Sequence, residues 1–388
     1  MADANFQFAS PRRVKRSGMG IIMKIAVDAR TMGSRPSGVG MYLFDFLKQL
    51  IKYKEFEFVL LSDVAESEYI KYFAQRGIEV RTSGRHVYKS VEVYSYFAFI
   101  KNELKRVKPD LFWEVNAVIP VRLSGNFKTM ITIHDMFPIT HVKYFGRVYS
   151  AYFRHSLSKT LKNTDMILYN SEQTRLTTEA IFPAAKSIAN ENAYIITNPL
   201  DRNYDNSDDG YFLYIGNMEK RKGVDILLNG YREYCYRKGT KRLIVAGKML
   251  EDDIQALLYE VQEECEGLEY LDYVTDEKKH ELYAHCSCFL FPSRAEGFGM
   301  PVLEAMKHRK PVIVADLGIF DEIAQGCLNT FKMQGVDKVN YITDSFVQRM
   351  FDYNTEIDEA AYSEAIKRYS PEYLGMVVKT FIEDNIGK

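Results

Sequence analysis

The sequence predicts an α/β protein of two doubly wound domains with mainly parallel sheets. Its 388 residues exceed the ~100–200 that one domain usually holds. Short apolar runs alternate with longer segments of helical periodicity, and this alternation restarts after a polar stretch near residue 200. The composition, 46% hydrophobic and 27% charged, excludes collagen-like and disordered classes. No apolar run approaches the ~20 residues of a membrane span, so we expect no integral membrane protein.

The first domain is predicted over residues 23–198. Met23 begins a strong strand pattern, and residues 1–22 are interpreted as an extension, native or artificial, with a basic membrane-surface arm as the alternative. Strands are expected at 24–27, 56–62, 78–80, 110–113, 128–134 and 165–170, and helices at 41–53, 92–107 and 149–161. The aromatic run 88–99 is interpreted as core, with contact to a membrane or an acceptor as the alternative.

The second domain is predicted over residues 199–370, after a linker marked by Asn198, Pro199 and the polar segment 201–210. Strands are expected at 211–216, 242–247, 268–274, 288–292 and 311–315, with helices from about 224 and 301 and a long acidic helix between them. A terminal helix over 371–388 carries Tyr373, Leu374, Val377 and Phe381 on the face expected to pack.

The charge is divided unevenly along the chain. Residues 1–190 carry 28 Lys and Arg against 17 Asp and Glu, whereas residues 191–388 carry 23 against 35. The basic half is expected either to face an anionic lipid, nucleic acid or phosphorylated substrate, or to complement the acidic half across an interface. The five Cys are odd in number and lie in the second half, which favours a reducing compartment over a disulfide framework.

Three strand–loop–helix junctions contain residues suited to an anionic ligand. In SGVG, Gly38 and Gly40 allow close backbone approach, although a plain tight turn explains them as well. In IGNMEKRKG, Gly216 ends a strand, and Lys220, Arg221 and Lys222 crowd the start of a helix. Cations there oppose the helix dipole, so the pattern predicts a bound anion such as a diphosphate, unless the side chains extend into solvent.

The segment SRAEGFGMPVLEAM is the most informative junction. Its loop holds Glu296 and Gly297, and Pro301 fits the first turn of the following helix. The N–H groups of Gly299, Met300 and Val302 are expected to point into the cleft, between the carboxylates of Glu296 and Glu304. Two hydrogen-bond acceptors around a patch of N–H donors match a sugar nucleotide, which has hydroxyls at both ends and a diphosphate between them. The alternative for Glu304 is a residue that only complements the helix dipole.

This last segment resembles the EX7E signature of the retaining glycosyltransferases of family 4, also called glycosyl transferases group 1. The resemblance covers nearly all of residues 23–388, through SGVGMYLFDFL, TIHDMFPI, NSEQTRLTTEAIF, YFLYIGNMEKRKGVDILLNGY and YSPEYLGMVVKTFIEDNI. It implies the GT-B fold, in which two Rossmann-like domains face a cleft and the C-terminal helix returns to the N-terminal, acceptor-side domain.

The resemblance also implies roles for individual residues. Glu296, Lys222 and His134 are the catalytic candidates: Glu296 would hold hydroxyls of the transferred sugar, Lys222 the diphosphate, and His134 would lie near the sugar. The donor-binding candidates are Gly38, Gly40, Gly216, Asn217, Arg221, Lys222, Gly297, Phe298, Gly299, Met300, Pro301, Val302 and Glu304, with Glu304 on the ribose. The family usually has Arg at position 217, and the amide of Asn217 cannot make a bidentate phosphate contact, so Arg221 is expected to share that role.

The expected activity is transfer of a hexose from a nucleotide diphosphate sugar to a growing surface glycan of the O-antigen or capsule type, and the acceptor is expected to be lipid-linked. The resemblance implies a retaining front-face reaction that needs no cofactor and no metal. It also implies a cytoplasmic protein, peripheral at the inner face of the plasma membrane. A non-catalytic sugar-nucleotide-binding or scaffolding subunit and a GT-B epimerase are the alternatives. A nucleic-acid partner is not expected, because no recognisable motif is present.

Overall fold

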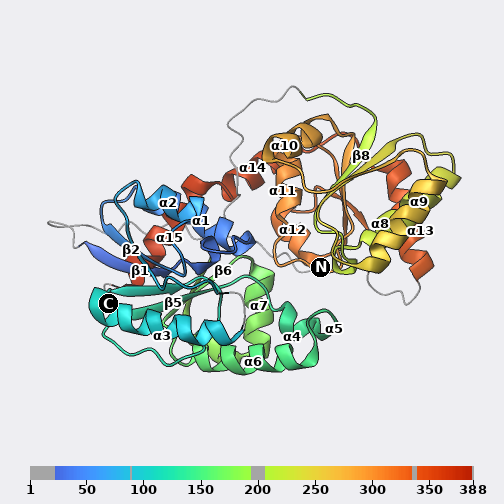
Figure 1. Cartoon of the computed structure of the whole chain (residues 1–388). Coiled ribbons are helices and arrows are strands. Elements are labelled where there is room, and N and C mark those ends of the chain that lie inside the picture. Colours follow the sequence, from blue (N-terminus) through green and yellow to red (C-terminus); the bar gives the residue numbers. More distant parts are fainter. Residues whose placement is uncertain (1–21, 88–89, 194–205, 334–338, 387–388) are drawn as a thin grey trace.

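The computed structural model describes residues 22–87, 90–193, 206–333 and 339–386. Two parallel sheets form the centres of two α/β units (Figure 1). The first sheet has seven strands in the order β3-β2-β1-β4-β5-β6-β7, and the second has six in the order β10-β9-β8-β11-β12-β13. The predicted fold class is therefore confirmed. The predicted boundary at 198–199 and all but the last residue of the extension lie outside the described residues.

The first unit matches the predicted strand and helix pattern closely. Its strands are β1 Met23–Asp28, β2 Phe56–Ser62, β3 Glu79–Thr82, β4 Leu111–Glu114, β5 Lys128–Ile133, β6 Met166–Tyr169 and β7 Ala189–Asn192. Its helices are η1 Arg30–Met32, α1 Gly38–Leu50, α2 Glu68–Ala74, α3 Ser90–Val107, α4 Phe137–Thr140, α5 Val142–Phe145, α6 Arg147–Leu161, α7 Glu172–Ile181 and η2 Pro183–Ser187. The strand order changes direction at β1, which lies between β2 and β4. Ligands of open parallel sheets bind outside the carboxyl ends of strands at such a point.

The second unit repeats the arrangement around β8. Its strands are β8 Tyr211–Ile215, β9 Arg242–Ala246, β10 Leu268–Leu271, β11 Cys288–Phe291, β12 Val312–Ala315 and β13 Asn329–Phe331. Its helices are η3 Lys220–Lys222, α8 Val224–Tyr236, α9 Asp252–Glu264, α10 Asp276–His285, α11 Met300–Lys307, α12 Gly318–Ala324, α13 Val339–Asp352 and α14 Glu359–Arg368. Here the order changes direction between β8 and β11, so the loops after these two strands are neighbours.

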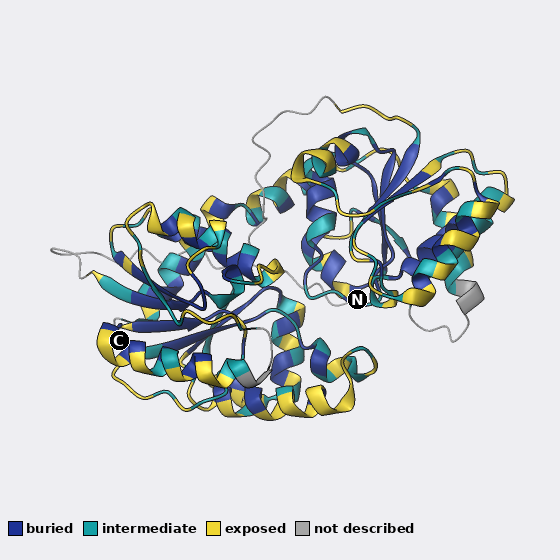
Figure 2. Cartoon of the chain, viewed as in Figure 1, coloured by how far each residue is buried: buried dark blue, intermediate teal, exposed yellow. Residues whose placement is uncertain are grey.

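Burial explains which strands the sequence reveals. Strands β4, β6, β11 and β12 are buried at every position because helices cover both faces of each sheet (Figure 2). Such strands are continuous apolar runs and were predicted. The edge strands β7 and β13 have the polar sequences ANEN and NTF and were not. Each of these strands pairs with a neighbouring strand on one side only, and this pairing, not the residue types, determines its extended conformation.

The C-terminal helix α15, Pro371–Ile386, packs on α1 of the first unit (Figure 1). The predicted packing face was partly wrong, because the buried residues are Leu374, Gly375, Val378, Phe381 and Ile382, whereas Tyr373 is 37% exposed and Val377 is half-buried. The close approach explains this orientation, since a Cβ on Gly375 would lie 2.8 Å from Cβ of Gln49. At the far end, Lys379 Nζ lies 3.5 Å from Glu55 Oε1.

We predict that Gly375→Leu separates α15 from α1, because the new side chain would overlap Gln49. Overpacking of this kind costs about 1–3 kcal/mol, so thermal denaturation should show a lower midpoint than for the wild type. The matched control is Met376→Leu on the exposed side of the same helix, which should leave the midpoint unchanged. Equal midpoints for the two variants would contradict the packing described here.

Candidate active site

The loop after β11 joins the two units at a very close contact. Ser171 Oγ, at the end of β6, donates a hydrogen bond of 2.9 Å to Gly297 O. A Cβ on Gly297 would lie 2.6 Å from His134 O and 3.1 Å from Cβ of Asp135, both at the end of β5. Only glycine fits this position. The carboxyl ends of the two sheets therefore meet at Gly297, beside the predicted catalytic residues.

Glu296 and Lys222 form an ion pair next to this contact. Lys222 Nζ lies 2.7 Å from Oε1 and 2.9 Å from Oε2 of Glu296. The two side chains are 16% and 6% exposed, so the pair is largely shielded from water. Gly223 follows at φ +71°, where a Cβ would lie 1.8 Å from Pro292 O. This close packing fixes the turn that presents Lys222 to the loop after β11.

Glu304 lies one helical turn into α11 and is buried. Gly299, at φ +105° and ψ 49°, precedes the helix, and Pro301 occupies its first turn as predicted. Lys279 Nζ of α10 lies 3.0 Å from Glu304 Oε1. Lys279 was not predicted as a site residue, because its neighbours Asp276 and Lys278 make it resemble an ordinary charged helix surface.

His134 is held as a neutral imidazole. Its Nε2 lies 3.0 Å from Val115 O, and a carbonyl oxygen only accepts, so Nε2 carries the hydrogen. The ring of Tyr42 from α1 stands edge-on to it, with centroids 4.8 Å apart. Burial lowers the pKa of His134 to about 4, only partly offset by the contact with Val115. Its Nδ1 is then an acceptor, and the ring carries no charge at neutral pH.

Asp135 shares the electrostatic environment of the ion pair. Burial raises its pKa, and the charge of Glu296 adds to that shift. The Phe137 N–H, 3.0 Å from Asp135 Oδ1, and the cations Arg221 and Lys222 act in the opposite direction. The site thus combines the carboxyl groups of Asp135 and Glu296 with two cations at the junction of the two sheets.

The cations at 220–222 have partners within the protein, and a diphosphate at this place stays a prediction. Lys220 pairs with Asp253, and Lys222 with Glu296. Arg221 Nη2 lies 2.6 Å from Glu219 Oε1, and its Nη1 donates to Ala295 O at 3.2 Å. All three lie in the separate turn η3 that precedes α8, so protein partners already compensate their charge.

The glycines of the predicted loops differ in their surroundings. A Cβ on Gly38, at the start of α1, would meet nothing within 4 Å, which leaves room for a ligand. A Cβ on Gly40 would lie 2.0 Å from Thr31 O, and its N–H donates to Ser37 Oγ, so packing and capping account for Gly40. Gly216 directly follows β8, and a Cβ on Gly247 would lie only 1.9 Å from the carbonyl oxygen of Gly216.

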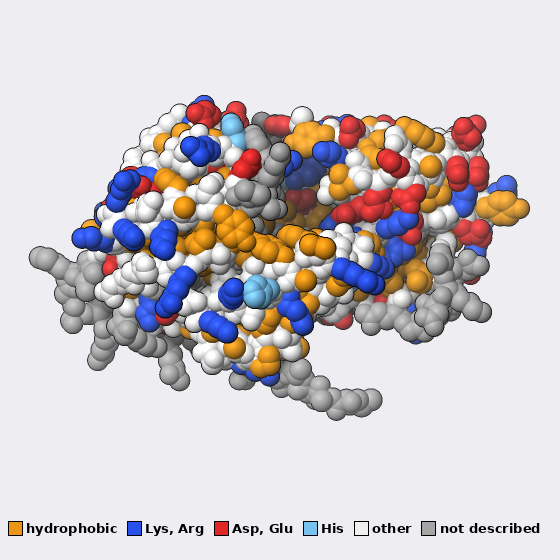
Figure 3. All heavy atoms as spheres, turned by 60° about the horizontal axis from the view of Figure 1, so that its bottom comes forward, with side chains coloured by type: hydrophobic (Ala, Val, Ile, Leu, Met, Phe, Trp, Pro, Cys, Tyr) orange, Lys and Arg blue, Asp and Glu red, His pale blue; other side chains and the backbone are white. Residues whose placement is uncertain are grey.

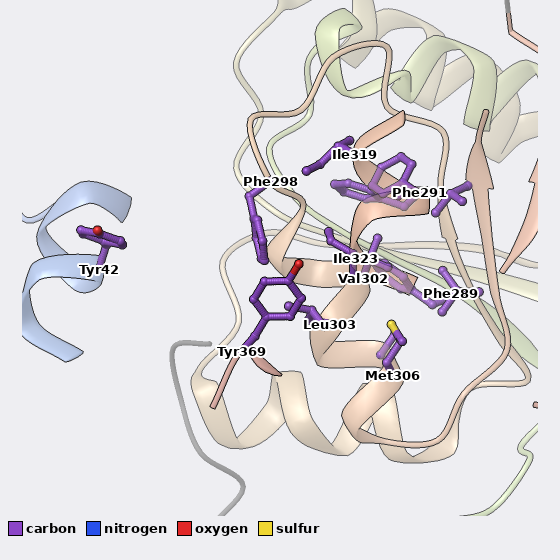
Figure 4. Packing of buried hydrophobic residues seen from close by; sticks show 14 of the residues in the cluster. Tyr42, Phe289, Phe291, Phe298, Val302, Leu303, Met306, Ile319, Ile323 and Tyr369 are labelled. Carbon is purple, nitrogen blue, oxygen red and sulfur yellow. The ribbon is translucent and has the colours of Figure 1, made fainter. Parts of the chain in front are cut away.

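Two predicted donor contacts before α11 are not available in the expected form. The N–H of Val302 donates to Gly299 O at 3.0 Å and so does not point into the cleft. The left-handed conformation of Gly299 directs its carbonyl at that N–H. The side chain of Phe298 packs on Tyr369, with centroids 5.0 Å apart (Figure 4). Gly299 precedes α11 and Met300 begins it, as predicted for this junction.

The side chain of Asn217 is exposed at the end of β8. Its backbone carbonyl accepts a hydrogen bond of 2.9 Å from Tyr214 Oη, which fixes the loop. Arg221 lies with its guanidinium carbon 5.6 Å from the centre of the Phe137 ring in the first unit. A cation therefore stands at the junction without a basic residue at 217. Within the described residues, no group of three or more His, Cys, Asp and Glu could hold a metal ion, and metal independence stays a prediction.

The fold and the paired carboxylates define a two-domain protein of the GT-B type. The model "Glycosyltransferase Family 4" matches residues 36–203, and "Glycosyl transferases group 1" matches residues 200–326. The chain belongs to this glycosyltransferase family, as the EX7E segment predicted.

Relatives and solved structures agree with this assignment. The chain is 31% identical to the O-antigen chain mannosyltransferase B of Escherichia coli over 57% of its own length and 60% of that protein's. It is 22% identical to the O-antigen chain mannosyltransferase RfbU of Salmonella typhimurium over 76% of this chain and 83% of that protein. The structure of WaaG, a glycosyltransferase involved in lipopolysaccharide biosynthesis, matches with TM-score 0.67 at 14% identity over 93% of this chain and 99% of that one. The structure of Anabaena HepE in complex with UDP and glucose matches with TM-score 0.64 at 16% identity, over 93% of this chain and 99% of that one.

We predict that His134 makes stability depend on pH. The unfolded chain takes up the imidazole proton near pH 6.5, whereas the folded protein takes it up only near pH 4. Between these values the unfolded state binds more protons, so the unfolding free energy falls as pH falls, by up to about 3 kcal/mol. Urea denaturation at pH 7 and pH 4 should show a smaller loss for His134→Gln than for the wild type. His155→Gln, on the exposed side of α6, is the control, and equal losses in all three proteins would contradict this account.

Proposed function

We propose that this protein transfers a hexose from a nucleotide diphosphate sugar to a growing surface glycan of the O-antigen type, with retention of anomeric configuration. The observation that carries the proposal is the shielded Lys222–Glu296 pair where the two sheets meet, with Glu304 one helical turn into α11. Family membership supports the reaction class. The names of the O-antigen mannosyltransferases among its relatives support the glycan class and favour mannose as the sugar.

Donor binding would redistribute the partners of the ion pair. The diphosphate would take Lys222, and hydroxyls of the sugar would take Glu296. Because the pair is only 16% and 6% exposed, the charge that grows on the leaving phosphate would be stabilised in a site with little water. Arg221 supplies a second cation within reach of Asp135, which supports catalysis despite Asn217. Glu304 would hold the ribose, with Lys279 orienting its carboxylate.

The retaining reaction requires attack by the acceptor on the face from which the diphosphate leaves. His134 is neutral, and its Nδ1 is an acceptor, so it could take a hydrogen bond from a sugar hydroxyl without adding charge. Its low pKa makes it a weak base at neutral pH. We therefore propose a positioning role for His134 and place the main rate effect on Lys222.

No helix within the described part of the chain has the length and hydropathy needed to cross a membrane. Peripheral binding at the inner face of the plasma membrane, a lipid-linked acceptor and a cytoplasmic location stay predictions, drawn from the basic first half and the family. Each basic residue near an anionic surface contributes about 1 kcal/mol, so such binding would weaken as salt rises.

We predict opposite effects for the two carboxylates. Glu296→Ala should lower kcat at least 100-fold without weakening the binding of the nucleoside diphosphate, because Glu296 would hold the sugar and competes with the diphosphate for Lys222. Glu304→Ala should raise that Kd about 10-fold, the usual effect of losing one charged hydrogen bond. Release of nucleoside diphosphate from UDP, GDP, dTDP and ADP sugars gives kcat, and titration calorimetry gives Kd.

Glu260→Ala, on the exposed side of α9, is the control and should change neither quantity. Loss of nucleotide binding in Glu296→Ala would refute the assignment of that residue to the sugar. Binding of a nucleotide sugar without turnover by the wild type would favour the non-catalytic subunit, and conversion of the sugar without transfer would favour the epimerase.

A further inference from the structure

The two units do not touch over the whole of their facing surfaces. Figure 3 shows a hollow between them, so contacts beside the hollow decide how the units are oriented. The hydrogen bond from Ser171 Oγ to Gly297 O is one such contact and joins the end of β6 to the loop after β11. A single point of contact permits rotation about it. A second contact at a distance from the first would restrict that rotation.

Helices α7 and α12 provide this second contact (Figure 1). Helix α7 belongs to the first unit and begins directly after Ser171, whereas α12 belongs to the second unit and follows β12, the strand that pairs with β11. The start of α12 lies beside α7, because a Cβ on Gly318 would lie 3.8 Å from Gln173 Oε1. The ends of neighbouring strands in one sheet are thus held against the start of a helix in the other unit.

Glu322 of α12 accepts two hydrogen bonds from the backbone of α7. Its Oε1 lies 2.7 Å from Glu172 N, and its Oε2 lies 3.1 Å from Gln173 N. The first N–H groups of a helix have no partner within the helix, and a carboxylate there is also favoured by the helix dipole. The carboxylate of Glu172 itself is engaged by Arg175 and Asn192. A side chain of the second unit therefore caps a helix of the first.

Both helices are fixed within their own units. Ile319 and Ile323 of α12 are fully buried and pack into the core of the second unit (Figure 4). At the start of α7, Ser171 Oγ accepts a hydrogen bond of 3.1 Å from Thr174 N. Because each helix is anchored, the two bonds of Glu322 link the orientation of one unit to that of the other.

The carboxyl group of Glu322 is half-buried between its partners. Burial raises its pKa, while the N–H groups of Glu172 and Gln173 and the charge of Arg368 oppose that shift. Arg368 of α14 also donates from Nη1 to the backbone oxygen of Glu322 at 3.3 Å. The side chain therefore has a defined place in the docked arrangement of the two units.

We propose that Glu322 is a positioning residue, which caps α7 and thereby sets the orientation of the two units that brings His134 and Asp135 to the Lys222–Glu296 pair. The proposal rests on the proposed function and deepens it. The contacts of Glu322 are made with the backbone of α7 and with Arg368, so its effect on the reaction is exerted through α7. A displacement of about 1 Å between reacting groups lowers a rate by up to about 100-fold.

Hydrogen exchange of the full chain, read at single-residue resolution, measures the contact directly. The amides of Glu172 and Gln173 should exchange about 10-fold faster or more in Glu322→Ala, because the helix offers them no other partner. The amide of Thr178, further along α7, should keep its protection and so show that the helix is still folded. Glu322→Gln retains one acceptor oxygen and should protect only one of the two amides.

The rate of nucleoside diphosphate release from nucleotide sugars measures the effect on the reaction. Glu322→Ala should lower kcat about 10-fold or more, and Glu322→Gln should fall between it and the wild type. The Kd of the nucleoside diphosphate should stay within about twofold, because Lys222, Glu296 and Glu304 all belong to the second unit. Asp321→Ala is the matched control, an exposed carboxylate of the same helix, and should change neither exchange nor kcat.

Three results would overturn the proposal. The amides of α7 exchange in Glu322→Ala as in the wild type, or they exchange faster while kcat is unchanged, or kcat falls together with a loss of nucleotide affinity, which would place the damage inside the second unit. Failure of the proposed function has a different signature. A wild-type protein whose α7 amides depend on Glu322 but that releases no nucleoside diphosphate from any nucleotide sugar would refute the transferase and leave the orienting contact established.

Discussion

The ion pair between Lys222 and Glu296 is the interaction on which the site depends. A carboxylate with 6% exposure is costly to bury without a partner, and removing one partner of such a pair usually costs several kcal/mol. The pair ties the loop after β8 to the loop after β11, at the point where the strand order changes direction. Arg294 strengthens the same connection, with Nη2 2.7 Å from Asp225 Oδ2 on α8. These contacts place two charged groups of opposite sign at one end of the sheet.

The first unit completes this arrangement through Gly297. Because a Cβ there would collide with His134 O, the backbone of the loop after β11 lies directly against β5. Ser171 also holds that loop from the end of β6. Helix α15 joins the units a second time by packing on α1. The position of Glu296 relative to the ends of β5 and β6 is thus set by backbone contacts as well as by side chains.

Most of the fold could be predicted from the sequence, because buried parallel strands are continuous apolar runs and their helices have a clear period. The two polar edge strands could not, since pairing and not composition determines them. The face of α15 was partly misjudged because the close approach of Gly375 to Gln49 fixes its rotation, and a partner surface is invisible in one helix.

The proposed site was predictable in outline for a different reason. The EX7E spacing placed Glu296 and Glu304, but no local pattern indicated which cations pair with them. Lys279 comes from another helix, and the ion pair of Lys222 with Glu296 joins residues 74 positions apart in the sequence. Long-range neighbours of this kind arise only from the tertiary fold.

The central claim is that Lys222 exchanges Glu296 for the diphosphate of the donor. A crystal structure of the protein with its nucleotide sugar tests this most directly. The account predicts Lys222 Nζ within hydrogen-bonding distance of a diphosphate oxygen, with Glu296 on hydroxyls of the sugar. A complex in which Lys222 remains on Glu296 and the diphosphate lies elsewhere would contradict it.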